Sequence, residues 1–114
     1  MIAMFLCLVA SVTDGDTLRC DNGTRVRLAG IDAPEMPGHC ARWRQCTAGD
    51  PFAAKRALTI LVQGKTLQCQ SLGKSYNRIL ATCRIGSFEP ACYMVTHGYA
   101  VKRYSESWMV CRNG

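Results

Sequence analysis

Most of the acidic residues of this chain lie in one short stretch near its start. Of eight Asp and Glu residues, five fall between positions 14 and 35, and four of these are candidates for chemistry: Asp14, Asp16, Asp32 and Glu35. The first two flank a glycine in Asp-Gly-Asp, and the other two follow a second break in the chain at Gly30. Carboxylate oxygens are hard ligands, which suit Ca²⁺ or Mg²⁺ better than zinc. Aspartate and glycine also form turns for backbone reasons alone, so Asp-Gly-Asp by itself leaves both interpretations open.

Two arginines are candidates for binding a phosphate group. Arg27 lies in a predicted strand, and Arg78 follows a polar stretch at the start of another. Guanidinium groups and a divalent cation together stabilise the charge that develops on a phosphodiester in its transition state. A nearby carboxylate can then orient or deprotonate the attacking water. Considered alone, either arginine is better explained as a solvated surface charge.

The overall charge favours a polyanionic partner. The chain has 14 Lys and Arg against 8 Asp and Glu, which gives a formal net charge of +6. Such an excess suits nucleic acid, although a generic basic surface would produce it too. At 114 residues the chain has enough apolar material for one core, so we expect residues 1–114 to form a single domain.

The pattern of side chains predicts three strands before the first long loop. Residues Ala3 to Val12 are almost continuously apolar, which is typical of a strand buried on both faces. Asn22-Gly23 is a strong hairpin signal between two short strands, which we expect at 17–20 and 25–28. In the second of these, the alternation places Arg27 on the face opposite Val26 and Leu28.

The remainder predicts a loop, two helices and two more strands. Residues 33–49 contain two prolines and read as a loop. Asp50-Pro51 then begins a helix that ends at Gly64, with an apolar face at Ala53, Ala57, Ile60 and Leu61. Strands are expected at 66–70 and 78–84, joined by a polar loop at 71–77, and a short helix after them closes at Gly98. This order predicts a mainly β fold, a five-stranded OB-fold barrel with two or three short helices.

Three motifs in order resemble the staphylococcal nuclease family. They are Asp14-Gly15-Asp16-Thr17, then Arg-Leu-Ala-Gly-Ile-Asp-Ala-Pro-Glu over residues 27–35, and Tyr76-Asn77-Arg78 before the last strand. The resemblance covers roughly Phe5 to Tyr104. It implies a calcium-dependent phosphodiesterase that cuts single-stranded or relaxed DNA and RNA with little sequence preference and leaves 3′-phosphates. The rival is a catalytically inactive OB-fold module that binds nucleic acid or protein, which we expect to have lost a carboxylate or arginine of this set.

The same resemblance implies a role for each site residue. Asp16 and Asp32 correspond to the calcium carboxylates, with the backbone carbonyl of Ala33 as a further ligand and Asp14 behind them. Glu35 corresponds to the residue that activates or positions water, and Arg27 and Arg78 to the arginines on the phosphate. Tyr76 and Tyr104 correspond to aromatic contacts to the nucleotide, because an exposed ring can stack on any base.

The chain departs from the family pattern in three places. Ala33 replaces a threonine, which keeps the carbonyl but loses a hydroxyl, while Lys74 and Asn77 replace the Asp and Gly of the family's Asp-x-Tyr-Gly-Arg signature. The ending Ser105 to Gly114 is short and polar where relatives of this type carry a third helix. We therefore expect the C-terminal end either to close differently or to be truncated.

Eight cysteines in 114 residues indicate disulfides and an oxidising compartment, periplasmic or secreted. No Cys-x-x-Cys pair occurs, and the spacings match no zinc pattern. Buried free thiols are the alternative. The predicted strand order brings Cys7 near Cys20 and Cys69 near Cys83. Cys40 and Cys46 would close a short loop, which leaves Cys92 to pair with Cys111.

The apolar start could be mistaken for the core of a signal peptide. Residues Met1 to Ala10 lack a preceding basic region and run directly into Asp14, so we interpret them as a strand. This stretch is also too short to span a membrane, and we expect no membrane association.

Overall fold

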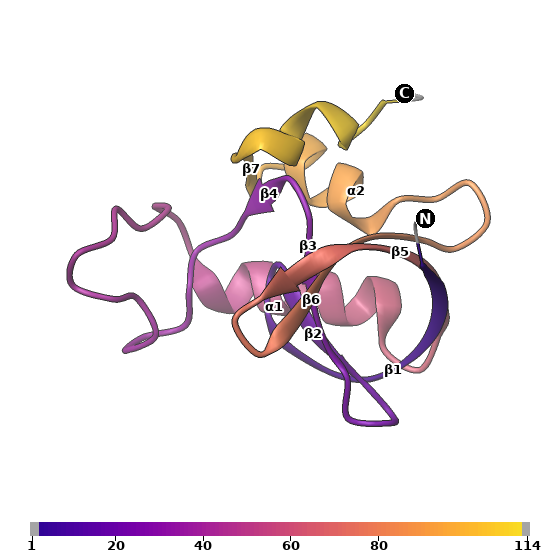
Figure 1. Cartoon of the computed structure of the whole chain (residues 1–114). Helices are drawn as coiled ribbons and strands as arrows, with labels where there is room; N and C mark the ends of the chain where they lie inside the picture. The colour runs from indigo at the N-terminus through magenta and orange to yellow at the C-terminus, as the bar shows by residue number, and fades with distance from the viewer. Residues whose placement is uncertain (1–2, 113–114) are drawn as a thin grey trace.

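The computed structural model describes residues 3–112 and shows a closed five-stranded barrel (Figure 1). The strands lie in the order β1-β2-β3-β6-β5, and all neighbours are antiparallel except β3 and β6. Their bounds are β1 Met4–Asp14, β2 Thr17–Cys20, β3 Arg25–Leu28, β5 Thr66–Ser75 and β6 Arg78–Arg84. The mainly β, OB-fold-like barrel expected from the sequence is therefore confirmed.

Two helices and a small second sheet lie outside the barrel. Helix α1 is Pro51–Val62 and α2 is Pro90–Thr96, and a 3-10 helix, η1, occupies Ser105–Met109. Strands β4 (Ile31–Asp32) and β7 (Val101–Lys102) pair antiparallel in a separate sheet, which the sequence did not predict. Among the helices of the described residues, none is both long and apolar enough to cross a membrane.

Helix α1 begins and ends where the sequence predicts, but its buried face is different. The side chain of Asp50 caps the helix by accepting hydrogen bonds from the backbone N–H groups of residues 52 and 53, at 2.9 and 3.2 Å. The buried residues are Ala54, Leu58 and Val62, whereas Ile60 is 72% exposed. The expected apolar face was therefore wrong by one position. Two neighbouring rows of this helix are apolar, so periodicity could not say which row faces the barrel.

Strand β1 is buried on one face only, which corrects the expectation of a fully buried strand. Cys7 and Val9 point into the core, while the side chains of Met4, Leu6 and Leu8 are 61%, 68% and 41% exposed. In a small closed barrel successive residues point alternately inward and outward, so a continuous apolar run still leaves half of its side chains outside.

The predicted loop 71–77 is largely strand. Strand β5 continues to Ser75, and a tight turn at Tyr76 and Asn77 leads directly into β6. The register shifts between Ser71 and Gly73, where β5 carries an irregularity of the β-bulge type. Because the hairpin is longer than expected, Tyr76 lies at its tip and not in a flexible loop.

All four expected cysteine pairs are present as disulfides. Their Cα–Cα distances are 5.1 Å for Cys7–Cys20, 6.2 Å for Cys40–Cys46, 4.1 Å for Cys69–Cys83 and 4.8 Å for Cys92–Cys111. The first and third join neighbouring barrel strands, and the fourth joins α2 to the segment after η1. The described residues contain no free cysteine. Such a set indicates an oxidising, non-cytoplasmic location.

We expect no titratable thiol in protein unfolded without reductant, and eight after reduction, since every cysteine has a partner. Reaction with a thiol reagent in denaturant measures this directly. A count of eight before reduction would contradict both the pairing and the oxidising location.

Candidate active site

The turn between β1 and β2 is held against α1 by a glycine that has no room for a side chain. A Cβ atom on Gly15 would lie 2.8 Å from the Cβ of Ala54 and 2.9 Å from that of Ala33. This close approach brings Asp16 beside the segment that follows β4, where the backbone N–H of Ala33 donates to Asp16 Oδ2 at 2.8 Å. The two acidic motifs therefore meet, as expected from the sequence.

Asp32 is buried and accepts hydrogen bonds on both carboxylate oxygens. Oδ1 accepts from Arg27 at 3.1 Å and from Arg44 at 2.8 Å. Oδ2 accepts from the hydroxyl of Thr47 at 2.6 Å and from Arg103 at 2.9 Å. Burial alone would raise the pKa of Asp32, but the hydrogen bonds from Thr47 and Arg44 outweigh it and hold this pKa below its ordinary value.

Asp16 has fewer positively charged partners than Asp32, and its pKa is shifted in the opposite direction. Burial raises its pKa, and the charge of Arg27 together with hydrogen bonds from Ala33 and Thr17 offsets this effect only in part. Arg27 lies between the two carboxylates, with Nη2 3.4 Å from Asp16 and 3.1 Å from Asp32.

Arg27 is almost fully buried, although strand alternation placed it opposite the apolar face of β3. Only 7% of the residue is exposed, because the segment that follows β3 folds over it. Its Nη1 donates to the carbonyls of Leu28 and Ile31, both at 2.8 Å. The guanidinium is therefore fixed on both sides before any substrate arrives.

Compared with those of Arg27, the N–H groups of Arg78 are less occupied by protein hydrogen bonds. Its nearest polar contacts are weak, to the hydroxyl of Thr17 at 3.5 Å and the carbonyl of Ser75 at 3.4 Å. No carboxylate of residues 3–112 forms an ion pair with it. Burial, followed by the neighbouring charge of Arg27, lowers the pKa of Arg78 from its ordinary value. Additional negative charge at this position would be favourable.

A cleft of about 790 Å³ gathers most of the predicted site residues. Those that line it are Asp14, Asp16, Arg27, Glu35, Tyr76, Arg78 and Tyr104. Asp32 and Ala33 do not line it; they lie buried directly behind, in contact with Arg27 and Asp16. The structure thus brings together all of the residues singled out for catalysis and nucleotide contact.

The oxygen donors here fit a hard cation in type. Asp16 and Asp32 are carboxylates that both lie within 3.4 Å of one Arg27 nitrogen. Side chains alone do not build a complete set, since no group of three or more His, Cys, Asp or Glu residues within 3–112 is arranged to hold a metal ion. A site at this position would rely on two carboxylates supplemented by backbone carbonyl and water oxygens, which is common for calcium.

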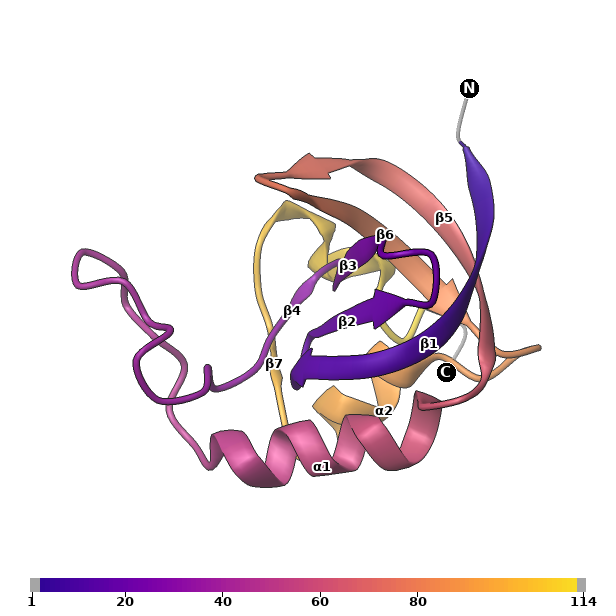
Figure 2. The same ribbon diagram turned by 90° about the horizontal axis from the view of Figure 1, so that it is seen from below.

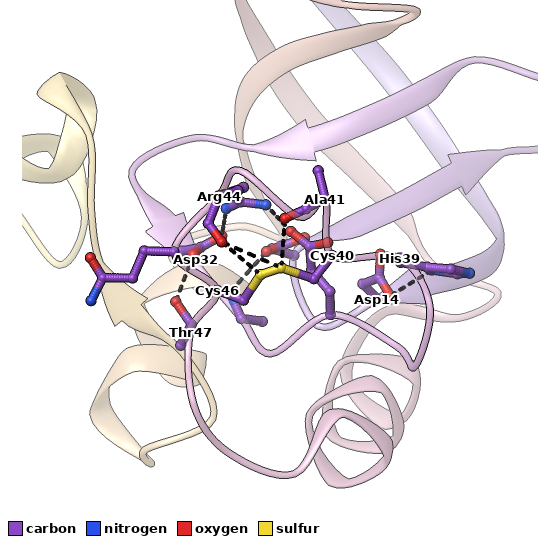
Figure 3. Close-up of polar contacts among 12 residues, drawn as sticks. Asp14, Asp32, His39, Cys40, Ala41, Arg44, Cys46 and Thr47 are labelled. Atoms are coloured by element: carbon purple, nitrogen blue, oxygen red, sulfur yellow. Dashed lines mark hydrogen bonds and ion pairs between the residues drawn. A yellow bond between two sulfur atoms is a disulfide. The ribbon is translucent and has the colours of Figure 1, made fainter.

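Sequence reasoning missed Arg44, which lies at the centre of the polar network (Figure 3). It contacts Asp32, forms an ion pair with Glu35, and donates to the hydroxyl of Tyr104 at 2.7 Å. Thr47 and Arg103 were missed as well. The sequence offered one signal for Arg44, its position between two cysteines. Its contacts with Asp32 and Tyr104, which are 12 and 60 positions away, leave no local pattern in the sequence.

Tyr104 is held in an unusual backbone conformation by its neighbours. Its φ is 72°, and the guanidinium of Arg103 lies 5.3 Å from the ring centroid. The tail before and after it packs on Gly30, where a Cβ would meet the carbonyl oxygen of Glu106 at 2.8 Å. Tyr76, at the tip of the β5–β6 hairpin, has a φ of 59° and is 93% exposed.

Comparison with known proteins finds a similar protein but no matching family model. No protein-family model matches the chain. The chain is similar to a protein of Haemophilus influenzae (strain ATCC 51907 / DSM 11121 / KW20 / Rd) named "Uncharacterized endonuclease", with 33% identity over 106 residues. The alignment covers 87% of this chain and 54% of that protein, so the chain spans about half the length of this relative.

We expect replacement of Asp32 by Ala to lower the free energy of unfolding by about 3 kcal/mol, because the guanidiniums that it pairs would be left uncompensated. Urea denaturation in the presence of chelator measures this effect. Asp21→Ala, at an exposed aspartate on the hairpin after β2, is the matched control and should change stability by less than about 0.5 kcal/mol. Equal losses in the two variants would show that the Asp32 network does not stabilise the fold.

Proposed function

We propose that this chain is a nuclease of the staphylococcal type, which hydrolyses phosphodiester bonds of DNA or RNA with little sequence preference and depends on calcium. The observation that carries the proposal is the cleft in which Arg27 and Arg78 face the carboxylates of Asp14, Asp16 and Glu35. The similarity to a protein named as an endonuclease supports the same conclusion. The catalytic set implied by the three motifs is complete, which argues against an inactive binding module.

Arg78 is the group best placed to bind the scissile phosphate. Its guanidinium lies in the cleft with weak protein contacts and no paired carboxylate among the described residues. A phosphate gains charge on its equatorial oxygens in the transition state, so a planar donor contributes most at that point. Arg27 adds positive charge from the cleft wall, while its own position is fixed by two carbonyls.

Glu35 is the residue that we assign to the attacking water. It lines the same cleft and is held by its ion pair with Arg44. A carboxylate held in this way can accept a hydrogen bond from water and orient it toward phosphorus. Asp16, Asp32 and the carbonyl of Ala33 would hold the calcium ion, for which Asp32 would exchange hydrogen bonds that it accepts from arginines. When bound, the ion would polarise the phosphate and neutralise part of its developing charge.

The proposed setting is a periplasmic or extracellular one. Four disulfides within 114 residues are suited to an oxidising compartment. A net charge of +6 favours encounter with any polyanionic strand at low salt. Single-stranded or relaxed nucleic acid is the proposed substrate.

We expect the oxidised protein to degrade a single-stranded DNA oligonucleotide with calcium and to stop when excess chelator is added. Gel analysis of a labelled oligonucleotide follows both steps, and calcium added back should restore cleavage. The products should carry 3′-phosphates, which mass spectrometry of the fragments identifies. Equal cleavage in chelator, or tight binding without cleavage at any calcium level, would contradict the proposal, and the second result would favour the binding-module alternative.

Replacing Arg78 by Ala should lower kcat by about a hundredfold to a thousandfold, because it removes donors to the transition state. Arg84→Ala, an exposed arginine at the other end of the same strand, is the matched control and should retain turnover. Arg27 is less suitable, since it also holds Asp16 and Asp32. Near-normal turnover of the Arg78 variant would remove this residue from the mechanism.

A further inference from the structure

The loop between β4 and α1 carries exposed groups that the proposed chemistry does not use. It projects away from the barrel in both views (Figures 1 and 2). A disulfide between Cys40 and Cys46 closes its outer part, with the two Cα atoms 6.2 Å apart. This outer part encloses the sequence Ala-Arg-Trp-Arg-Gln at residues 41–45.

The loop is anchored on the site by its second half. Arg44 turns inward to Asp32, Glu35 and Tyr104, and Thr47 donates to Asp32 at 2.6 Å (Figure 3). Arg103 donates to the carbonyl of residue 45 at 3.0 Å from the other side. The disulfide and these contacts together restrict where the residues next to Arg44 can lie.

Trp43 is the immediate neighbour of this anchor and lies on the cleft, yet 89% of it is exposed. An indole is the largest apolar side chain, and leaving it in water forgoes the free energy that its burial would contribute. Arg42, next to it, is exposed too. An exposed aromatic ring beside positive charge is the usual arrangement for stacking an unpaired base.

We propose that Trp43 is a stacking platform for an unpaired base of the substrate strand, one or more nucleotides away from the scissile phosphate. The proposal rests on the proposed nucleic-acid substrate and adds a binding site to it. Arg44 acts as a positioning residue that fixes the platform at the cleft, and Arg42 is placed to contact the phosphate backbone. In duplex nucleic acid the faces of the bases are covered by their neighbours, so the platform selects for single strands.

The charges around the ring favour nucleic acid over an apolar partner or a membrane. Arg42 and Arg44 flank it in sequence, and the cleft that it lines also contains Arg27 and Arg78. A strand whose phosphate occupies Arg78 would reach Trp43 within the same cleft, and Arg42 is the exposed positive charge next to the ring in sequence. A purely apolar partner would gain nothing from these guanidiniums.

The test uses the full oxidised chain in chelator, so that binding is measured without cleavage. A labelled single-stranded oligonucleotide is titrated with wild type, Trp43→Ala and Trp108→Ala, and anisotropy gives each affinity. Trp108 is the matched control because it is 62% exposed and does not line the cleft. We expect the Trp43 variant to bind about fivefold to a hundredfold more weakly, the usual range for loss of one stacked base, and the Trp108 variant to bind as wild type does. Thermal melts of both variants check that the fold is kept.

Fluorescence provides a second, direct measurement. The chain has two tryptophans, so Trp108→Phe leaves Trp43 as the sole indole, and we expect single-stranded DNA to quench its emission more than duplex of equal length does. Vesicles of anionic phospholipid should not shift this emission. A shift with vesicles but no quenching by oligonucleotide would overturn the proposal in favour of a membrane contact.

The outcomes separate this site from the proposed activity. Binding that does not depend on Trp43, with cleavage intact in calcium, would overturn the stacking platform and leave the nuclease proposal standing. Binding that depends on Trp43, without cleavage at any calcium level, would support the platform and count against the nuclease. Failure of wild type both to bind any oligonucleotide and to cleave one in calcium would overturn both.

Discussion

The buried carboxylate of Asp32 joins three parts of the chain that lie far apart in sequence or in different elements. Arg27 reaches it from barrel strand β3, Arg44 from the disulfide-closed loop and Arg103 from the segment after β7, at N–O distances of 2.8 to 3.1 Å. A single buried charge would be strongly unfavourable, and so would guanidiniums packed this closely without a carboxylate. Each partner therefore depends on the others. Arg27, Arg44 and Tyr104 line the cleft from these segments, so the network fixes this part of its wall.

Local signals in the sequence were sufficient for the strand order and for the ends of the helices. Asp50-Pro51 begins α1 because a carboxylate caps free N–H groups and proline lacks one, and neither effect depends on the rest of the fold. The errors in β1, in the face of α1 and in the loop 71–77 have another origin. The errors in β1 and α1 concerned which side of the element faces the core, and the error in 71–77 concerned how far strand β5 stays paired. Tertiary packing decides both, and Leu6 and Ile60 are exposed although their types suit a core.

The residues of the candidate site also fall into two groups, those placed by local sequence and those placed by tertiary contacts. The motif residues converge on one cleft because short turns fix them: Gly15 allows Asp16 to approach Ala33, and the β5–β6 turn places Tyr76 and Arg78 at one end of the hairpin. Arg44 and Arg103 were not predicted as site residues. Their contacts with Asp32 span 12 and 71 positions and depend on a loop and a tail without regular structure. Candidate site residues on turns can be recognised from the local sequence, whereas residues that hold those turns in place cannot.

Two of the four disulfides restrict the segments that carry Arg44 and Arg103, the residues that hold the turns in place. Cys7–Cys20 and Cys69–Cys83 lie within the barrel, where strand pairing already fixes their partners. Cys40–Cys46 restricts the loop that carries Arg44, and Cys92–Cys111 ties down the tail that carries Arg103 and Tyr104. For the latter, a separation of 19 residues corresponds to about 3 kcal/mol of lost chain entropy in the unfolded state. A barrel of this size leaves little core to hold two irregular segments, so covalent links do so where packing cannot.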